Sequence, residues 1–396
     1  MDIERDEVIE LLSNLIEIYS PYFEEDKVMD YAYTYLEKNN IPVSYHRYEE
    51  NLITNFKGTN LVGSIKGREK GPKILLNGHL DTVHLSRGWT KDPLKATIEG
   101  DRLYGLGALD MKGGCAAIII AIKAFVKNVK DFKGEIVYTL VSDEEGPYGL
   151  GTDATIIDGI TKDIDFSIIT EPSSAFANTQ FPCLCLGARG GYNYKVDLYG
   201  KASHVASPEY GIDAILDGAK LITELANTEL KEDPLLGRGS LVVIETSGGG
   251  AAASVSDHAS FSVFRHVVRG EDKEFLINEV KEAAKRANIK SKYEINFRPS
   301  PHPDLDGFKP YTVDKNNYYT KEIQNTIREV TGKFAKEAYF SSMGDFNYLG
   351  TRLGSPAFIF GPSGENYHSP DEWVSIDEVV KSSEVIYSLL KKLLSF

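Results

Sequence analysis

Apolar residues recur with helical spacing at the start of the chain. Ile9, Leu12 and Ile16 repeat every three or four residues, and a second run of this kind covers residues 28–36. Such spacing places apolar side chains on one face of a helix. The pair Asn39-Asn40 ends the second run, as is common at a helix C-terminus. The chain is therefore expected to begin with two amphipathic helices.

The next part of the chain alternates short apolar runs with helical segments. Helices are predicted at 111–127, where most positions are small or apolar, and near 152–158. Strands are predicted at 42–48, 60–66, 73–78, 134–142 and 165–170. Alternating strands and helices are typical of an α/β fold, in which helices cover both faces of a central sheet.

The pattern changes at about residue 187. The predicted elements are then, in order, strand 192–199, helix 211–226, strands 240–246 and 259–265, helix 271–288 and strand 292–298. This β-α-β-β-α-β order is that of a ferredoxin-like α+β domain. The proline-rich segment 298–303 closes it, and the pattern of the first domain resumes after it. We expect a first domain of residues 1–186 and 299–396, interrupted by an inserted domain of residues 187–298.

Composition narrows the possible partners and compartment. The chain has 396 residues and a formal net charge of -14, so a nucleic-acid or anionic-membrane partner, which needs clustered positive charge, is not expected. No apolar stretch approaches the roughly 18 residues that span a bilayer. The N-terminus shows no signal peptide. Three cysteines fit a reducing compartment rather than a disulfide framework, so we expect a cytoplasmic protein.

Cys183 and Cys185 form a closely spaced cysteine pair. A Cys-x-Cys pair can bind a metal, but no second pair with zinc-finger spacing accompanies this one. We interpret both residues as small, buried apolar side chains.

Residues that can bind metals follow the predicted strands. His79 and Asp81 come after strand 73–78, and a last core strand at 356–360 is followed by a loop that contains His368. Acidic residues follow other strands or precede the long helix, and they are Asp110, Asp143, Glu144, Glu145 and Glu171. In open α/β sheets, ligands bind beyond the carboxyl ends of the strands, so we expect these side chains to meet in one cleft.

This set of side chains has the chemistry of a metal site. Two histidines with several carboxylates suit zinc, with cobalt or manganese as alternatives. A carboxylate shared by two cations would allow a pair of metals about 3.5–4 Å apart. Alone, His79 is more often structural, and a single acidic residue is more often surface charge. Because five strand or turn ends carry such residues together, we interpret them as a metal site, with zinc as the first choice by ligand type.

Five short motifs resemble those of one metallohydrolase family, in the same order along nearly the whole chain. They are His79-x-Asp81-Thr82-Val83, Gly105-x-Gly107-x-x-Asp110-Met111-Lys112-Gly113-Gly114, Asp143-Glu144-Glu145, Glu171-Pro172-Ser173 and Tyr367-His368-Ser369-Pro370-Asp371-Glu372. The family includes acetylornithine deacetylase, succinyl-diaminopimelate desuccinylase, aminoacylase-1 and glutamate carboxypeptidase. The resemblance implies a mixed central sheet of the zinc-exopeptidase type and an inserted domain that serves as dimerisation domain and lid.

The resemblance also implies a role for each matching ligand-type residue. Asp110 would bridge the two metals. His79 and Glu171 would complete the ligands of one metal, and Glu145 and His368 would complete those of the other. The cofactor implied is therefore a pair of divalent ions, Zn²⁺ by resemblance, with Co²⁺ or Mn²⁺ as substitutes.

Glu144 and Asp81 would act beside these metals. By resemblance, Glu144 is the general base, which takes a proton from a metal-bridging water and passes it to the leaving amine. Asp81 would hydrogen-bond the far nitrogen of His79, which fixes the tautomer of that histidine and raises its basicity. The implied reaction is the hydrolysis of an amide bond.

Three further residues match family positions that contact the substrate. In the family, the histidine that matches His204 reaches the active site of the partner subunit and stabilises the oxyanion, which requires a homodimer built through the inserted domain. Arg265 resembles the arginine that grips the substrate's carboxylate, and Gly361 begins the substrate loop. Without the resemblance, His204 would be an ordinary loop histidine and Arg265 a strand-end arginine in water.

Four positions depart from the family pattern. Leu106 stands in place of an arginine and Val263 in place of an aspartate. Ser254 stands in place of an asparagine, and Ser363 in place of the second glycine of the substrate loop. None of these is a metal ligand, and all lie where substrate would be recognised. They affect the prediction of the substrate more than the prediction of the chemistry.

The predicted function is metal-dependent hydrolysis of the amide bond of an N-acyl amino acid, in the manner of the deacetylases and desuccinylases. A metallo-carboxypeptidase or dipeptidase acting on short peptides is the main alternative. A homologue that only binds a metal or an amino acid is the other, although such a protein would not need Glu144 beside a ligand. Gly105-x-Gly107 lacks the third glycine of a dinucleotide site, and no Gly-x-Ser-x-Gly elbow supports a serine hydrolase.

Overall fold

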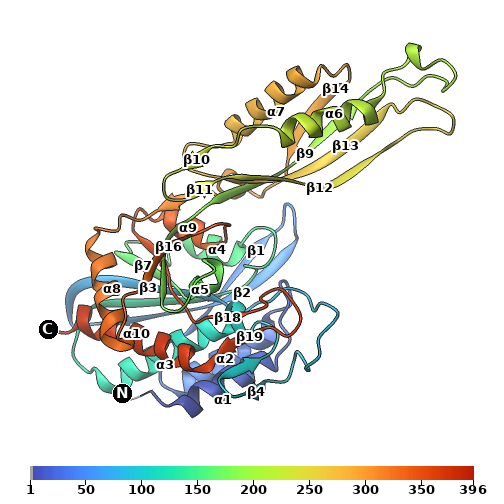
Figure 1. Ribbon diagram of the computed structural model, residues 1–396. Helices are drawn as coiled ribbons and strands as arrows, with labels where there is room; N and C mark the ends of the chain where they lie inside the picture. Colours follow the sequence, from blue (N-terminus) through green and yellow to red (C-terminus); the bar gives the residue numbers. More distant parts are fainter. Residues whose placement is uncertain (1–2) are drawn as a thin grey trace. The chain divides into compact units, whose positions relative to one another are not determined.

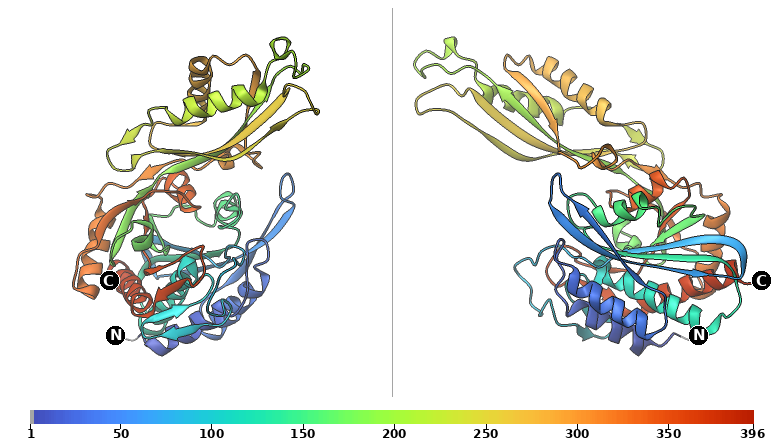
Figure 2. Two further views of the ribbon diagram at one scale, coloured as in Figure 1. Left: turned by 45° about the vertical axis from the view of Figure 1, so that its right-hand side comes forward. Right: turned by 180° about the vertical axis from the view of Figure 1, so that it is seen from behind.

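A computed structural model describes residues 3–396, which divide into two compact units (Figures 1 and 2). The first unit is the chain up to Ala188 together with Thr312–Phe396, and the second unit is Arg189–Tyr311. In sequence, the second unit is therefore an insertion in the first.

The end of the second unit differs from the predicted end of the inserted domain at residue 298. The backbone of Phe308 forms an antiparallel bridge with Gly191, near the start of the second unit. Each N–H donates to the other residue's carbonyl, with N···O distances of 2.8 and 2.9 Å. These hydrogen bonds keep the segment after residue 298 with the second unit up to Tyr311.

The first unit is built on a nine-stranded mixed sheet, which confirms the predicted fold class. The strand order is β1-β2-β6-β3-β7-β17-β8-β15, and β16 pairs with β8. Neighbours β6, β3, β7 and β17 are parallel, whereas β1 and β2 are antiparallel to their neighbours. The strands are β1 (Ser44–Glu50), β2 (Phe56–Lys66), β3 (Glu69–His79), β6 (Lys133–Val141), β7 (Phe166–Ile169), β8 (Cys183–Ala188), β15 (Tyr311–Thr312), β16 (Lys336–Phe340) and β17 (Ala357–Ile359).

Helices cover both faces of this sheet, as predicted (Figure 1). The first face carries α1 (Arg5–Ile16), α2 (Asp26–Lys38), α3 (Gly113–Asn128), α8 (Tyr318–Thr331) and α10 (Ile376–Leu394). The opposite face carries α4 (Leu150–Ile157) and α9 (Phe346–Arg352). Helix α3 is buried along most of its length because it lies between the sheet and the helices α1 and α10. This position explains why its sequence is apolar on every side.

A second, small sheet of the first unit was not predicted. Its order is β18-β19-β5-β4. The strands are β4 (Thr97–Glu99), β5 (Arg102–Tyr104), β18 (Gly364–Glu365) and β19 (Trp373–Ser375). Strands of two or three residues are too short to show the alternation by which a strand is recognised in a sequence. This sheet pairs the segment before the Asp110 turn with the segment after the His368 loop.

The second unit has the predicted ferredoxin-like topology. Its sheet has the order β12-β13-β9-β14, entirely antiparallel. Helices α6 and α7 pack together on the sheet and enclose an apolar core. The elements are β9 (Gly190–Tyr199), α6 (Ala214–Ala226), the short pair β10 (Glu232–Asp233) and β11 (Gly237–Arg238), β12 (Ser240–Gly249), β13 (His258–Val267), α7 (Lys273–Ala287) and β14 (Lys292–Phe297). Both helices begin at an aspartate whose side chain accepts a backbone N–H, namely Asp213 and Asp272.

The three cysteines are free thiols, and all are buried. The interpretation of Cys183 and Cys185 as small apolar residues is therefore confirmed, because both lie fully inside β8 of the central sheet. Among residues 3–396, no helix is long and apolar enough to cross a membrane.

Candidate metal centre

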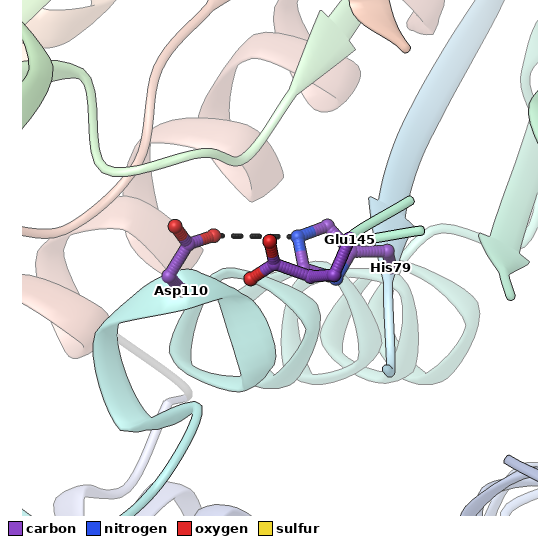
Figure 3. A group of neighbouring side chains, drawn as sticks. All are labelled: His79, Asp110 and Glu145. Carbon is purple, nitrogen blue, oxygen red and sulfur yellow. Dashed lines mark hydrogen bonds and ion pairs between the residues drawn. The ribbon is translucent and has the colours of Figure 1, made fainter. Parts of the chain in front are cut away.

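The carboxyl ends of parallel strands bring the predicted ligand-type residues together. Strand β3 ends at His79, strand β6 ends just before Glu144 and Glu145, and strand β7 ends just before Glu171. Because these strands are parallel neighbours, their carboxyl ends lie at the same edge of the sheet. Figure 3 shows His79 and Glu145 side by side at this edge, with Asp110 opposite them.

Asp110 lies in an irregular turn before the long helix, as predicted. The turn begins at Gly107, whose φ of 74° is left-handed, and Asp110 has φ -119° and ψ 95°. Regular α-helix begins only at Gly113, rather than at residue 111. The start of the helix packs so closely on strand β7 that a Cβ atom on Gly114 would lie 2.0 Å from the carbonyl oxygen of Thr170. The glycines of this motif therefore permit the close approach that brings Asp110 to the site.

The Asp110 carboxylate lies between the two histidines. Its Oδ1 is 3.3 Å from His79 Nε2, and its Oδ2 is 3.3 Å from His368 Nε2. Glu171 Oε1 is 3.4 Å from His79 Nε2, and Glu145 Oε1 is 2.8 Å from His368 Nε2. The site thus consists of two histidine–glutamate pairs, each in contact with a different oxygen of one shared aspartate.

His368 reaches this site from a loop after β17. Its backbone is left-handed, with φ 57°, as are those of Asn366 and Asp371 in the same loop. Such conformations are uncommon for residues other than glycine and cluster at functional sites. The His368 side chain is 46% exposed, whereas that of His79 is 1% exposed. Of the two histidine–glutamate pairs, the one with His368 is open to solvent.

Asp81 contacts both the Nδ1 side of the His79 ring and the backbone of Glu145. The Nδ1 atom of His79 is 3.0 Å from the carbonyl oxygen of Asp81 and 3.5 Å from its Oδ1. The other carboxylate oxygen, Oδ2, accepts the N–H of Glu145 at 2.9 Å. Asp81 is fully buried, so this contact network is shielded from water.

Glu144 lies beside the two histidine–glutamate pairs, but its carboxylate has other partners than that of Glu145. Its Oε2 is 3.8 Å from His79 Nε2, and its Oε1 accepts the backbone N–H of Asp345 at 3.1 Å. Asp345 is a buried residue that was not predicted, and the Thr152 hydroxyl donates to its carboxylate. No motif in the sequence marked Asp345, which directly precedes α9, a helix whose short pattern was not recognised.

Burial and mutual repulsion make the carboxylates of this site hard to ionise. Burial raises the pKa of Glu144 and Glu171 well above the usual range, and burial together with the Asp110 charge raises the pKa of Glu145 to about 7. Burial also opposes ionisation of Asp110, but hydrogen bonds from His368 and His79 hold its pKa below the usual value. Four carboxylates face two histidines here, so the site lacks positive charge.

The residues present fit a pair of divalent cations. Two groups of three ligand atoms lie within 4.8 Å of one another, His79 with Asp110 and Glu145, and His79 with Glu144 and Glu171. Among residues 3–396, the buried Oε2 of Glu171 has no hydrogen-bond partner. Imidazole nitrogens and carboxylate oxygens are suitable ligands for zinc, manganese and cobalt. A cation would supply both the missing positive charge and the missing partner.

The prediction that Arg265 binds the substrate is wrong. Its side chain is fully buried in the second unit, where NH2 lies 2.6 Å from Glu271 Oε1 and 3.1 Å from Glu279 Oε2. Its Nε donates to Glu279 and its NH1 to the carbonyl of His266. With its donors committed inside the core, the guanidinium cannot grip a substrate carboxylate without breaking this cluster.

His204 and Gly361 have different surroundings. His204 belongs to the second unit and is exposed, and its Nδ1 accepts the N–H of Ala206 at 3.1 Å. Gly361 is buried, and a Cβ atom there would lie 2.3 Å from the Thr170 carbonyl oxygen and 2.5 Å from that of Glu171. Gly361 is thus required for close packing behind Glu171, and its contact with substrate remains a prediction.

Lys112 and Glu372 were quoted within motifs, but their roles were not recognised. Lys112 is buried, and its Nζ donates to the carbonyls of Leu15 and Ile18, both at 2.9 Å, which ties the end of α1 to the Asp110 turn. Burial lowers the pKa of Lys112 to about 7. Glu372 is buried on the other side of the same turn. The sequence signal available for both residues was a charged side chain within a motif that also contains a predicted metal ligand.

Comparison with known proteins agrees with this geometry. The model of peptidase family M20/M25/M40 matches residues 75–392. The succinyl-diaminopimelate desuccinylase of Rickettsia akari (strain Hartford) is 29% identical over 402 residues, which cover 98% of this chain and 100% of that protein. Among solved structures, the aminopeptidase PepT of Bacillus cereus aligns with a TM-score of 0.80 at 18% identity, over 99% of both chains.

A third comparison concerns the metals. A Bacillus subtilis protein, described as a dinuclear metal binding peptidase from the M20 family, aligns with a TM-score of 0.70 at 15% identity, over 97% of both chains. At such identities the likeness concerns the fold alone, whereas the family match covers most of the chain. This chain therefore belongs to peptidase family M20/M25/M40 and is a metal-dependent hydrolase of amide bonds.

Proposed function

We propose that this enzyme hydrolyses the amide bond of an N-acyl amino acid, with a desuccinylase or deacetylase specificity. The observation that carries the proposal is the Asp110 carboxylate shared by two histidine–glutamate pairs, with Glu144 beside them. The 29% identity to a succinyl-diaminopimelate desuccinylase along the whole chain supports the choice of substrate class.

The proposed metal ligands follow from these contacts. Asp110 would be shared by two cations, with His79 and Glu171 on one and Glu145 and His368 on the other. Zinc is our choice, with cobalt or manganese as substitutes, because the donors are imidazole nitrogens and carboxylate oxygens. When bound, such a pair of cations lowers the pKa of a coordinated water and polarises the carbonyl of the substrate.

Glu144 is the proposed general base. One of its oxygens is fixed by the N–H of Asp345, and the other points toward His79, so its carboxylate is held at the edge of the site. From there it would take a proton from the attacking water and deliver it to the leaving amine nitrogen. Asp81 would keep His79 in one tautomer and orientation through the Nδ1 contact.

His204 is the proposed donor to the oxyanion, acting across a homodimer. Its Nδ1 accepts a hydrogen bond from Ala206, which leaves Nε2 to carry the proton and to donate it. Strand β12 supports a dimer through the second unit, because it is an edge strand with Val242 and Ile244 exposed at 51% and 54%. Unpaired edges of this kind readily pair with another chain. We propose that the dimer functions in the cytoplasm, where the three free thiols would stay reduced.

A substrate panel tests the proposal. Purified enzyme with bound Zn²⁺ or Co²⁺ would be assayed with succinyl-diaminopimelate, acetylornithine, acetyl-lysine, other acyl amino acids and dipeptides. We expect kcat/KM to be highest for an N-acyl amino acid. A preference for dipeptides would replace the proposed substrate by a peptide, and binding without turnover of any substrate would leave only a binding protein.

The cross-subunit role of His204 has a separate test. His204→Ala should lower kcat by about 10²–10³-fold while sedimentation still shows a dimer. Val242→Lys together with Ile244→Lys should give a monomer with a similar loss of activity. A fully active monomer would contradict the role of His204.

A further inference from the structure

Glu372 is a buried carboxylate just after the loop that carries His368. It is 1% exposed. Its Oε1 accepts the backbone N–H groups of Leu109 at 2.8 Å and Asp110 at 3.0 Å, and its Oε2 accepts that of Gly107 at 2.9 Å. One side chain thus satisfies three backbone donors of the turn that presents Asp110, although the two segments are far apart in the sequence.

The shape of this turn explains why it needs an external acceptor. Gly107 is left-handed, and the backbone of Asp110 is outside the helical region. Successive N–H groups in such a turn point to one side and form a binding place for an anion. A buried N–H left without a partner would destabilise this shape of the turn. The carboxylate of Glu372 occupies this place and fixes the shape of the turn.

The backbone of Glu372 also joins the His368 segment to the segment of the Asp110 turn. Its own carbonyl accepts the N–H of Gly105 at 3.0 Å. The residues that follow it form β19, which pairs with β5 immediately before the turn. Strand pairing and the Glu372 carboxylate therefore join the Asp110 turn to the His368 loop at two points.

We propose that Glu372 is a positioning residue that sets the distance between Asp110 and His368, and so maintains the metal position that these two residues would share with Glu145. This inference rests on the proposed function. Both oxygens of Glu372 are used by backbone donors, so it acts through Asp110 and not as a ligand. The metal position of His79 would share Asp110, but its other ligands, His79 and Glu171, stand at the ends of β3 and β7 of the central sheet, so it depends less on Glu372.

The experiment compares Glu372→Gln with Asp371→Asn. The control is matched because Asp371 is the adjacent residue and also accepts backbone N–H groups, but those of Thr90 and Lys91, away from the site. Each metal-free, full-length protein would be titrated with Zn²⁺ by calorimetry and with Co²⁺ by absorbance. Steady-state kinetics and thermal unfolding would be measured on the same samples.

In the unaltered protein we expect two ions to bind. In Glu372→Gln the amide NH₂ opposes one backbone N–H, so we expect one ion to bind about 10–100-fold more weakly and the other within about threefold of the unaltered protein. The value of kcat should fall more than KM rises. In Asp371→Asn both ions should bind within about threefold of the unaltered protein.

Two results would overturn the inference. Unchanged binding of both ions to Glu372→Gln would show that the residue does not position the site. Equal weakening of both ions with a matching loss of thermal stability would show a purely structural role. If Glu372→Gln is not recovered folded, Glu372→Asp keeps the charge and shortens the reach, and the same selective weakening is required of it. Failure of the unaltered protein to bind two ions would instead refute the proposed function.

Discussion

Each unit of this protein contains a cluster of buried charges. The two clusters differ in the balance of positive and negative charge. In the second unit, the Arg265 guanidinium lies between Glu271 and Glu279, and the three residues are at most 8% exposed. In the first unit, two histidines face four carboxylates at the strand ends. The Arg265 cluster satisfies its own charges, whereas the His79–His368 cluster has an excess of negative charge.

This difference separates a structural cluster from a functional one. Burying an unpaired charge costs several kcal/mol, so a stable protein pairs it, neutralises it or binds a counter-ion. The Arg265 cluster has its counter-charges built in. The His79–His368 cluster remains incomplete, and the oxygen of Glu171 without a partner marks where a cation would complete it.

The largest expected effect is that of metal removal, which should disrupt the His79–His368 cluster and leave the Arg265 cluster intact. Full chelation should abolish turnover, and stoichiometric Zn²⁺, Co²⁺ or Mn²⁺ should restore it. Metal content by mass spectrometry and activity would be measured on the same samples. Loss of the ions should also lower the unfolding temperature, since ions that bind only the folded state stabilise it. Activity that survives complete removal would contradict a metal-dependent mechanism.

A substitution of the proposed base should give the next largest effect. Glu144→Gln should lower kcat by about 10²–10⁴-fold, because general-base catalysis is lost, while both ions still bind. The neighbouring variant Glu145→Gln is the control, since it should weaken metal binding as well. If the two variants lose metal and activity in parallel, Glu144 is a ligand and not the base.

Removal of Arg265 should test whether the charges of the Arg265 cluster stabilise the fold. Arg265→Met leaves two buried carboxylates without a counter-charge and should destabilise the protein by about 3–5 kcal/mol. The triple variant Arg265→Met, Glu271→Gln and Glu279→Gln should recover much of this loss. Urea unfolding measures the stability, and KM at a temperature where the variants are folded should stay near that of the unaltered enzyme. A large rise in KM with unchanged stability would restore Arg265 as a substrate ligand.

The stability of the metal-free His79–His368 cluster should depend on pH in a defined direction. Burial raises the pKa of Glu145 from 4.5 to about 7, and hydrogen bonds with Asp110 and Glu145 raise that of His368 from 6.5 to about 11, against the effect of burial. Groups with raised pKa values stabilise the fold fully below their unfolded pKa, and this stabilisation is lost as the pH rises through the folded pKa. The metal-free protein should therefore lose stability between about pH 5 and pH 10.

Bound cations should reverse this dependence, because metal ligands must be deprotonated. Zn²⁺ affinity should rise with pH, and calorimetry in buffers of different ionisation enthalpy should detect released protons. Thermal unfolding of the metal-free and Zn²⁺-loaded proteins across this range provides the comparison. Equal pH profiles for the two forms would show that the titrating groups do not belong to the metal site.

The smallest expected effect concerns His266, beside the Arg265 cluster. Here the stability should fall as the pH falls, the opposite of the dependence expected for the metal-free His79–His368 cluster. Burial and the charges of Arg189 and Arg265 lower the pKa of His266 to about 4. A histidine with a depressed pKa costs stability as the pH falls from about 6.5 toward 4, because only the unfolded chain gains the proton readily. We expect a loss of roughly 1–2 kcal/mol after allowance for solvent screening. His266→Gln should remove this loss, and an unchanged acid profile in urea unfolding would contradict it.

Much of the fold could be read from the sequence because its main elements are long and periodic. The helix α3 and the strands β3 and β6 were predicted within a few residues, since each buries a continuous apolar face. The small sheet that includes β18 and β19 was not, because its strands are held by pairing between distant segments and have no pattern of their own.

The sequence by itself determined the type of site and the order of its donors. His79, Asp110 and Glu171 stand directly at strand or turn ends, where the geometry of an α/β sheet makes them converge. The positions of such residues along the chain are enough to predict that they meet, because the carboxyl ends of parallel strands lie at the same edge of the sheet.

Only the tertiary structure decided which charged residues are free to act. Arg265 stands at a strand position like that of a substrate ligand, but packing encloses it with Glu271 and Glu279. Glu372 lies in the motif of His368, but only folding brings its carboxylate to three N–H groups of a distant turn. The balance of a buried charge depends on neighbours that are remote along the chain, and a local pattern contains no information about them.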